Sequence, residues 1–254
     1  MNRTGQVAII TGGGGYIGGC IARLFGEEGA QVVICDIRQA EMDEVVHDIT
    51  ARGGKALALQ TNIREVGEIE ETVRKVKELY GRIDILANVA GGSAREDIAR
   101  IHLEKQEAID RILGVNFYGA FYFCRTVAGV MVEQGSGKII NIGSAVGIRG
   151  QAGLCDYSAA KGGIIALTKT LAMELGPYGI NVNCVSPGLV PRPGTPRDYV
   201  PATNYLGRIC TGEDVADLVD FLSGDKATFI TGENVVIDGG WSLGLKGDSG
   251  RHLK

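Results

Sequence analysis

Short apolar runs alternate along the chain with longer segments in which apolar residues recur at helical spacing. The apolar runs predict strands at residues 6–10, 31–35, 55–59, 83–87, 137–142, 179–185 and 233–237. The periodic segments predict helices at residues 17–28, 39–52, 65–80, 101–134, 157–176 and 212–223. Strands that alternate with helices form a parallel sheet with helices on both faces. The pattern therefore predicts an α/β fold with a doubly wound, parallel, seven-stranded sheet.

No linker, repeat or low-complexity tract divides the 254 residues, so we expect a single domain over residues 1–254. Two stretches lack a regular pattern. Residues 187–208 hold five of the six prolines, and residues 244–254 form a polar tail.

Composition and charge exclude several classes of protein. A net charge of −4 gives no basic footprint for nucleic acid. No apolar run approaches the roughly 20 residues that span a bilayer, and no amphipathic segment is typical of a membrane surface. The first strand begins too close to Met1 for a signal peptide. We expect a cytoplasmic protein with neither a nucleic-acid nor a membrane partner.

Cysteine and histidine spacing argues against a metal site. The six cysteines are scattered and include no Cys-x-x-Cys pair, as expected for free thiols in a reducing compartment. His47, His102 and His252 lie far apart, without neighbours at metal-ligand spacing.

A glycine-rich turn, residues 11–19, follows the first strand. In such a turn, backbone N–H groups and the helix N-terminus face a pyrophosphate, with Gly12, Gly15 and Gly18 in contact with it. A glycine turn alone equally serves to close a tight strand–helix connection. Asp36 favours the nucleotide, because it ends the second strand at the distance from Gly18 expected of an acid that binds a ribose diol.

The position of Asp36 also bears on the choice of cofactor. Its carboxylate would repel a 2′-phosphate, which favours NAD over NADP, although Arg38 is near enough to reach such a phosphate. Capping the helix that starts near Gln39 is a second role for Asp36, compatible with the first.

Tyr157 and Lys161 are four residues apart in a helical pattern, so their side chains share one face. A nearby ammonium lowers the pKa of a phenol, and the pair could then move a proton on and off an alcohol. Ser144 follows the strand 137–142 at the carboxyl edge of the sheet, where such folds bind ligands. Its hydroxyl would bond a substrate carbonyl or cap a turn.

Together these motifs resemble the short-chain dehydrogenase/reductase family over nearly the whole chain. The matching residues are Thr11, Gly12 to Gly18, Asp36, Asn88 to Gly91, Asn116, Ser144, Tyr157, Lys161, Pro187, Gly188, Ile230 to Gly232, and Asp238 to Gly240. The resemblance implies a Rossmann fold in which Tyr157 is the acid/base and Ser144 orients the substrate oxygen. Lys161 would lower the tyrosine pKa and bind the nicotinamide ribose, and Asn116 would support a proton-relaying water.

The resemblance also implies a set of cofactor contacts. These are Gly12, Gly15, Tyr16, Ile17, Gly18, Asp36, Ile37, Asn62, Ile63, Asn88, Ala90, Gly91, Tyr157, Lys161, Pro187, Gly188 and Val190.

Several positions depart from the family pattern. Val89 and Arg192 stand where relatives usually have asparagine and often have threonine, and Asn62 stands where many have aspartate. Tyr16 replaces the glycine usual in short members, so the turn resembles that of the longer sugar-nucleotide epimerases and dehydratases. Those relatives carry a separate C-terminal domain. Here the sheet pattern continues to residue 237, so the chain resembles the short, single-domain branch.

The resemblance implies an NAD-dependent oxidoreductase that interconverts a secondary alcohol and a ketone by hydride transfer. A 3-oxoacyl-(acyl-carrier-protein) reductase using NADPH is the alternative enzyme. Gly129 and Met173 occupy positions where those reductases present basic residues to the carrier, which argues against it. A non-catalytic dinucleotide sensor is the alternative of another class, and it is disfavoured because Tyr157 and Lys161 are both present.

The proline-rich stretch also bears on how a substrate reaches the site. Residues 187–208 would form a short, extended lid with little helix, because their prolines lack a donor. Such a lid suits a free small or medium-sized ketone or secondary alcohol, cyclic ones included.

In the family, helices corresponding to 101–134 and 157–176 form a dimer interface within a tetramer. We therefore expect a homotetramer, with a dimer as the alternative.

Overall fold

A single parallel sheet organises the computed structural model, which describes residues 1–93, 99–195 and 204–244. Its strands lie in the order β3-β2-β1-β4-β5-β6-β7, and every neighbouring pair is parallel. The strand bounds are Val7–Thr11 for β1, Gln31–Asp36 for β2, Lys55–Gln60 for β3, Ile85–Asn88 for β4, Gly137–Ile142 for β5, Ile180–Pro187 for β6 and Asn234–Ile237 for β7. The predicted doubly wound, seven-stranded fold is confirmed.

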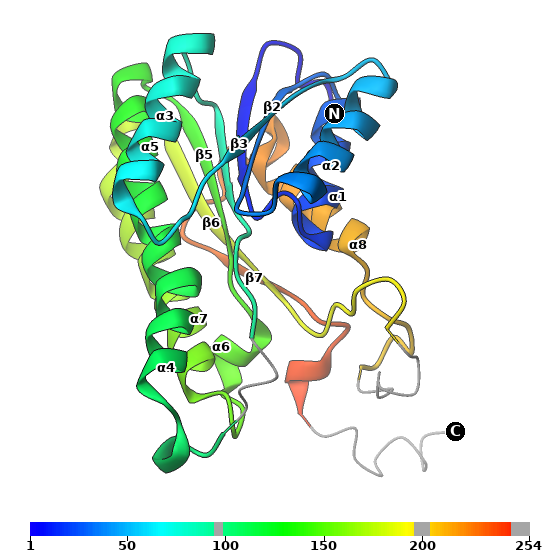
Figure 1. Ribbon diagram of the computed structural model, residues 1–254, viewed down its shortest axis with the longest axis vertical. Helices are drawn as coiled ribbons and strands as arrows, with labels where there is room; N and C mark the ends of the chain where they lie inside the picture. Colours follow the sequence, from blue (N-terminus) through cyan, green and yellow to red (C-terminus); the bar gives the residue numbers. More distant parts are fainter. Residues whose placement is uncertain (94–98, 196–203, 245–254) are drawn as a thin grey trace.

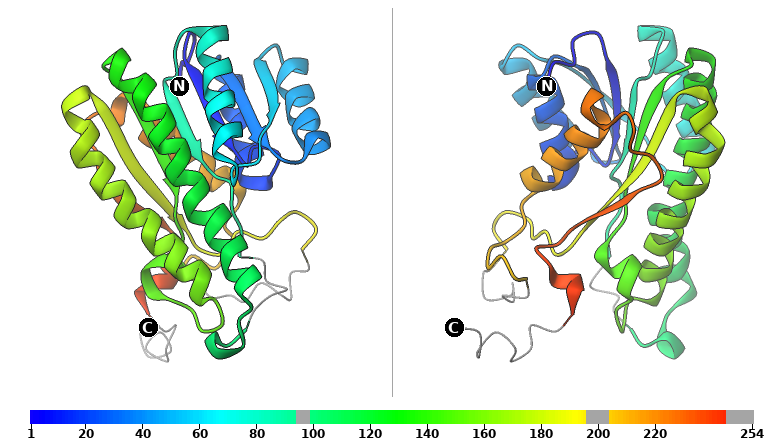
Figure 2. Two further views of the ribbon diagram at one scale, coloured as in Figure 1. Left: turned by 60° about the vertical axis from the view of Figure 1, so that its left-hand side comes forward. Right: turned by 180° about the vertical axis from the view of Figure 1, so that it is seen from behind.

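Helices cover both faces of the sheet (Figure 1). One face carries α1 (Tyr16–Glu27), α2 (Gln39–Ala51) and α8 (Gly212–Ser223). The other carries α3 (Val66–Tyr80), α5 (Gly119–Gln134) and α7 (Cys155–Leu175), and Figure 2 shows both layers from two further directions. Short turns η4 (Gly176–Tyr178) and η6 (Asp225–Ala227) precede β6 and β7.

Strand order reverses between β1 and β4, since chain order runs outward from this pair in both directions. At such a switch point, the loops that follow the two strands turn to opposite faces and leave a crevice at the carboxyl edge. Near that edge lie α4 (Gln106–Leu113), α6 (Ala145–Arg149) and η7 (Trp241–Leu243), at the bottom of Figure 1.

The prediction of one continuous helix over 101–134 is wrong in detail. A short η2 (Ile101–Leu103) comes first, and α4 then passes into the π-helical turn η3 (Gly114–Tyr118) before α5 begins. A π-helical turn inserts an extra residue without disturbing the apolar spacing much, so periodicity cannot reveal it. It turns Asn116 into the protein interior, where its side chain is 2% exposed.

Alternate residues of the central strands belong to two hydrophobic clusters, one on each face. On β1, Ile9 packs with the α3, α5 and α7 side, whereas Ile10 packs with the α1, α2 and α8 side. Both faces of the central strands are buried, which explains why they read as continuous apolar runs. Within the described residues, no helix is both long and apolar enough to cross a bilayer.

The predicted lid is only partly described. Residues 187–195 and 204–208 contain no helix, and residues 196–203 lie outside the described chain. Of the predicted polar tail, only Gly244 is described.

A fully buried arginine ties the chain's beginning to α1 and α8. The Arg3 guanidinium donates to Glu28 Oε2 at 2.8 Å and to Asp220 Oδ1 at 2.5 Å, and it lies 4.1 Å from the Phe25 ring centroid. Arg3 is 0% exposed, so its charge depends on these two carboxylates.

We expect Arg3→Ala to lower the free energy of unfolding by about 3–5 kcal/mol, because Glu28 and Asp220 would lose their buried cation. Urea denaturation measures this loss. Arg52→Ala is the matched control, since Arg52 pairs with Glu27 but its side chain is 62% exposed. Its loss should stay below about 1 kcal/mol. Equal losses in the two variants would contradict the importance of the buried pair.

Candidate active site

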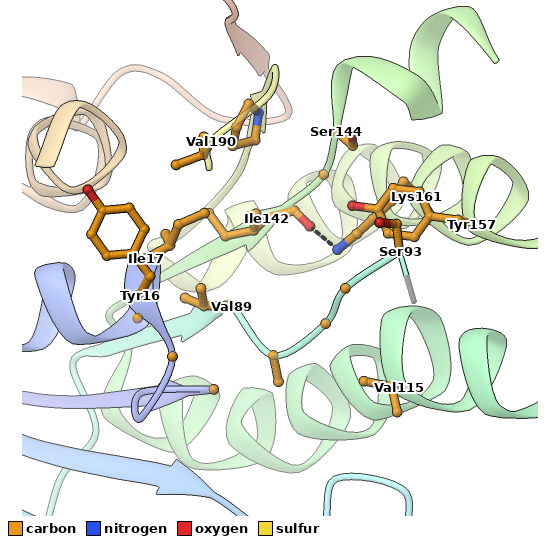
Figure 3. Close-up of a pocket in the computed structure, with 18 of the residues that line it drawn as sticks. Tyr16, Ile17, Val89, Ser93, Val115, Ile142, Ser144, Tyr157, Lys161 and Val190 are labelled. Atoms are coloured by element: carbon orange, nitrogen blue, oxygen red, sulfur yellow. Dashed lines mark hydrogen bonds between the residues drawn. The ribbon is translucent and has the colours of Figure 1, made fainter. Parts of the chain in front are cut away.

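A large cavity of about 1340 Å³ follows the carboxyl edge of the sheet. Asp36 and Ile37 line one part of it, and Ser144 and Tyr157 line another. In Figure 3, Tyr16 and Ile17 lie on one side of the pocket, whereas Ser144, Tyr157, Lys161 and Ser93 gather on the other. The cavity therefore connects the glycine turn to the predicted catalytic residues.

Close backbone contacts explain the glycines of the turn. Gly12 has a φ of +65°, and a Cβ there would lie 2.6 Å from the Ala90 Cα. A Cβ on Gly18 would lie 2.3 Å from the Gly12 carbonyl oxygen. Gly15 caps α1, so the first N–H groups of that helix, which have no partner within the helix, are directed to the cavity. This turn can accept an anion.

Tyr16 fits at the first position of α1 because its ring leans against α8. A Cβ on Gly212 would lie 3.1 Å from the tyrosine Cζ, so glycine leaves the space that the ring uses. The Tyr16 hydroxyl donates to Glu213 Oε2 at 3.2 Å. Burial, followed by the nearby Glu213 carboxylate, raises the pKa of Tyr16, so the phenol stays protonated and donates. The tyrosine at position 16 thus depends on the absence of a side chain at Gly212, far along the chain.

Asp36 lies in the cavity wall and is 7% exposed. Arg38 Nη2 donates to its Oδ2 at 3.1 Å and Arg38 Nε donates to its Oδ1 at 3.2 Å. Arg38 also lies 3.6 Å from Glu41. Its hydrogen bonds to Asp36 raise the pKa of Arg38 further, so this guanidinium stays charged.

Lys161 is buried at the opposite end of the cavity. Its ammonium donates to the Ile142 carbonyl oxygen at 2.7 Å, the dashed line in Figure 3. It lies 5.8 Å from the Tyr157 ring centroid, as the helical spacing predicts. Burial lowers the pKa of Lys161 to about 8, since the charged form loses solvation. The ammonium therefore loses its proton as the pH rises through about 8, well below the range of an exposed lysine.

Ser144 serves as the N-cap of α6 and is 8% exposed. Its Oγ accepts from the Val146 N–H at 3.2 Å, so its own O–H remains available to donate. The structural reading and the functional reading of this serine are therefore compatible. Sequence patterns did not predict α6, because a helix of five residues has too little periodicity to detect.

Two predicted site residues lie behind the cavity wall, outside its described lining. The Asn116 amide donates to the Gly92 carbonyl and accepts from the Gly92 N–H, both at 3.0 Å. The Asn88 amide donates to Asn141 Oδ1 at 2.9 Å, while its own buried Oδ1 has no partner within the described structure. Asn116 thus holds the lining residue Gly92, whereas Asn88 connects β4 to β5 beneath the cavity.

Every other predicted site residue lines the same cavity. These are Gly12, Gly15, Tyr16, Ile17, Gly18, Asp36, Ile37, Asn62, Ile63, Ala90, Gly91, Ser144, Tyr157, Lys161, Pro187, Gly188 and Val190. The Asn62 side-chain oxygen accepts from the Arg64 N–H at 3.1 Å, and its second lone pair could accept another bond.

Several lining residues were missed by the sequence reasoning: Ser93, Arg111, Val146, Gln151, Leu154 and Trp241. Arg111 belongs to α4, whereas the others come from loops and from the short helices α6 and η7, which have too little periodicity to detect. Only the folded chain brings these residues together. Trp241 did carry a signal, because it is the only tryptophan and directly follows the Asp-Gly-Gly motif.

Known proteins match this chain over nearly its full length. The family model described as Enoyl-(Acyl carrier protein) reductase matches residues 15–242. The chain belongs to the short-chain dehydrogenase/reductase family. Its members are oxidoreductases that bind NAD or NADP.

Individual members of the short-chain dehydrogenase/reductase family show the same coverage. A 3-oxoacyl-(acyl-carrier-protein) reductase of Thermotoga maritima is 37% identical, covering 94% of this chain and 99% of that protein. An NAD-dependent glycerol dehydrogenase of Listeria innocua is 36% identical, covering 96% of each chain. The crystal structure of levodione reductase superposes with a TM-score of 0.90 at 29% identity, over 95% of this chain and 99% of that one.

The cavity of this short-chain dehydrogenase/reductase fits a dinucleotide. Its volume is sufficient, and Gly12 and Gly18 let the backbone of the turn pack closely against Ala90 and against itself at the cavity wall. Asp36 offers a carboxylate to a ribose, and Lys161 offers an ammonium at the other end. The anion-accepting turn lines the same cavity as these two polar groups and could contact the pyrophosphate.

We expect Lys161→Met to shift the pH profile of alcohol oxidation. Without the ammonium, the pKa that governs the acidic limb of kcat/KM should rise toward the value of about 10 for an ordinary phenol. Lys161→Arg should keep that limb low, because a guanidinium stays charged. The control is Lys169→Met, which removes an exposed lysine of the same helix. If the acidic limb of kcat/KM keeps its wild-type pKa in Lys161→Met, the Lys161 ammonium does not lower the pKa of the catalytic phenol.

Proposed function

We propose that this protein is an NAD-dependent oxidoreductase that interconverts a secondary alcohol and a ketone. The observation that carries the proposal is the shared cavity, with Ser144, Tyr157 and Lys161 in one part of its wall and Asp36 in another. A dinucleotide anchored at Asp36 would extend toward Tyr157. The NAD-dependent glycerol dehydrogenase and levodione reductase among its relatives support a small, free substrate.

The proton chemistry follows from the donors and acceptors of this chain. Ser144 donates its O–H to the substrate oxygen, because its bond with the Val146 N–H uses only a lone pair of Oγ and leaves the hydroxyl hydrogen available. Tyr157 gives a proton to that oxygen during reduction and takes one during oxidation. The Lys161 ammonium stabilises the phenolate, while the Ile142 carbonyl holds the ammonium in place. When bound, nicotinamide supplies or accepts the hydride.

The preference for NAD rests on Asp36. Its carboxylate lies in the cavity wall and would bind two ribose hydroxyls, while a 2′-phosphate would meet its negative charge. Arg38 is engaged by both Asp36 and Glu41, so reaching a phosphate would require breaking those ion pairs.

A second candidate is reduction of a 3-oxoacyl group on acyl-carrier protein, supported by the Thermotoga maritima relative. The surface of α5 and α7 argues against docking of the carrier protein. Met173 is 72% exposed, and a Cβ on Gly129 would meet nothing within 4 Å, so both positions are accessible but uncharged. A non-catalytic sensor is a weaker candidate, because it would not require the buried Lys161 beside Tyr157.

We also propose a homotetramer. Along η3, α5 and α7, large apolar side chains remain exposed, including Tyr118 at 49%, Phe121 at 40% and Met173 at 72%. Self-association through this surface would remove them from water. Light scattering at micromolar concentration measures the assembly directly.

Tyr157→Phe tests the reaction. A panel of cyclic and acyclic ketones with NADH, and acetoacetyl-carrier protein with NADPH, is assayed by loss of the reduced cofactor's absorbance. We expect turnover of free ketones to fall by about 10²–10⁴-fold in Tyr157→Phe, because the ring remains but the acid/base is lost. NADH binding should persist. The control is Tyr178→Phe, an exposed tyrosine that precedes β6 at the other end of the sheet.

Two outcomes would overturn parts of this proposal. Substantial ketone reduction by Tyr157→Phe would remove Tyr157 from the acid/base role. A kcat/KM at least tenfold higher for the carrier substrate than for any free ketone would establish the second candidate.

Asp36→Ala tests cofactor choice. We expect the wild-type ratio of kcat/KM for NAD over NADP to exceed one, and to fall by about tenfold or more in the variant. The loss of two hydroxyl contacts and of the repulsion accounts for this fall. Arg38 would then be released toward a phosphate. Asp43→Ala is the control, since Asp43 accepts only from exposed Gln39 on α2 among the described contacts. A wild type that prefers NADP would show that Arg38 outweighs the carboxylate.

A further inference from the structure

Trp241 forms part of the cavity wall, although it lies beyond the last strand. Its turn is built rigidly. The buried Asp238 carboxylate accepts from the Gly240 N–H at 2.8 Å and from the Ser242 N–H at 2.7 Å, one on each side of Trp241. Gly239 and Gly240 have φ values of +63° and +86°, which glycine adopts without strain. The tryptophan backbone is therefore fixed relative to β7.

Arg149 holds the tryptophan from outside the cavity. The guanidinium carbon lies 4.9 Å from the Trp241 ring centroid, and Nη1 donates to the Trp241 carbonyl at 2.9 Å. Arg149 does not line the cavity in the described structure, whereas Trp241 does. Because the guanidinium lies over one face of the indole, only the other face is available for contact with a ligand.

The same short helix connects this indole to the proposed catalytic serine. Ser144 caps α6 at its beginning, and Arg149 is the last residue of α6. Five helical residues rise about 7.5 Å, so the arginine that holds the indole is kept at a short distance from the Ser144 hydroxyl. Between them, Val146 and the nearby Leu154 add apolar cavity wall.

We propose that Trp241 determines specificity by acting as a platform for the ring of a cyclic ketone or cyclic secondary alcohol. The ring would pack on the indole and against Val146 and Leu154, with its oxygen directed to Ser144 and Tyr157. Flat apolar surfaces stack well on an indole, whereas a flexible acyclic chain loses conformational entropy when it is ordered there. This inference rests on the proposed oxidoreductase function and adds its substrate class.

A matched pair of ketones tests the platform, namely cyclohexanone and 2-hexanone, each with six carbons, reduced with NADH. We expect the ratio of kcat/KM for cyclohexanone over 2-hexanone to fall at least tenfold in Trp241→Ala, chiefly through a higher KM for cyclohexanone. Trp241→Phe should restore most of the ratio, because a flat aromatic face returns. The exposed tyrosine variant Tyr178→Ala is the control and should keep the wild-type ratio.

Fluorescence gives a second readout that needs no turnover and no variant. Trp241 is the only tryptophan. Fluorescence excited at the long-wavelength edge of indole absorption therefore comes from this site alone. With NAD⁺ present, which cannot reduce the ketone, cyclohexanone should produce a saturable shift of the emission maximum. A saturable shift with cyclohexanone supports the platform.

Three kinds of result distinguish a failure of the Trp241 platform from a failure of the proposed reaction. A ratio that falls less than tenfold in Trp241→Ala, or a wild-type emission spectrum that cyclohexanone leaves unshifted, overturns the platform. Equal losses for both ketones assign Trp241 a structural role and also overturn it. If the wild type reduces no ketone yet shows the saturable shift, the proposed reaction fails while the ring-binding site stands.

Discussion

Parallel pairing of β1 with β4 is the constraint on which the rest of the site depends. Because the chain order reverses there, the loops after these strands diverge and leave the crevice open. The two loops still touch at their base, where Thr11 Oγ1 accepts from the Val89 and Ala90 N–H groups at 3.1 and 3.2 Å. Gly12 is required for that contact, since a Cβ would strike Ala90. The crevice is therefore open where the two loops diverge and closely packed where they leave β1 and β4.

Electrostatics within the crevice depend on burial. Lys161 is 4% exposed, and among the described contacts its hydrogen-bond partner is the Ile142 carbonyl, which carries only a partial charge. A buried ammonium without a carboxylate partner gains most from an anion that forms beside it. The Tyr157 phenolate would be that anion. Asp36, by contrast, has a cationic partner, because Arg38 pairs with its carboxylate at 3.1 Å.

Residues remote in sequence complete the site. Gly212 makes room for Tyr16, Gly92 is held by Asn116, and Trp241 is held by Arg149. In each pair, one residue touches the cavity, and the other leaves space for it or holds it in place. Such contacts explain how a shared fold acquires a particular pocket.

The strand and helix pattern by itself determined the sheet, because buried parallel strands must be apolar on both faces and are easily detected. It also located Asp36, Ser144, Tyr157 and Lys161, whose spacing follows from strand ends and one helical turn. Only tertiary structure decided the π-helical turn at Asn116, the inward direction of Asn88 and the presence of Trp241 in the cavity wall. These features depend on contacts between segments far apart in the chain, and such contacts leave no periodic signal in the sequence.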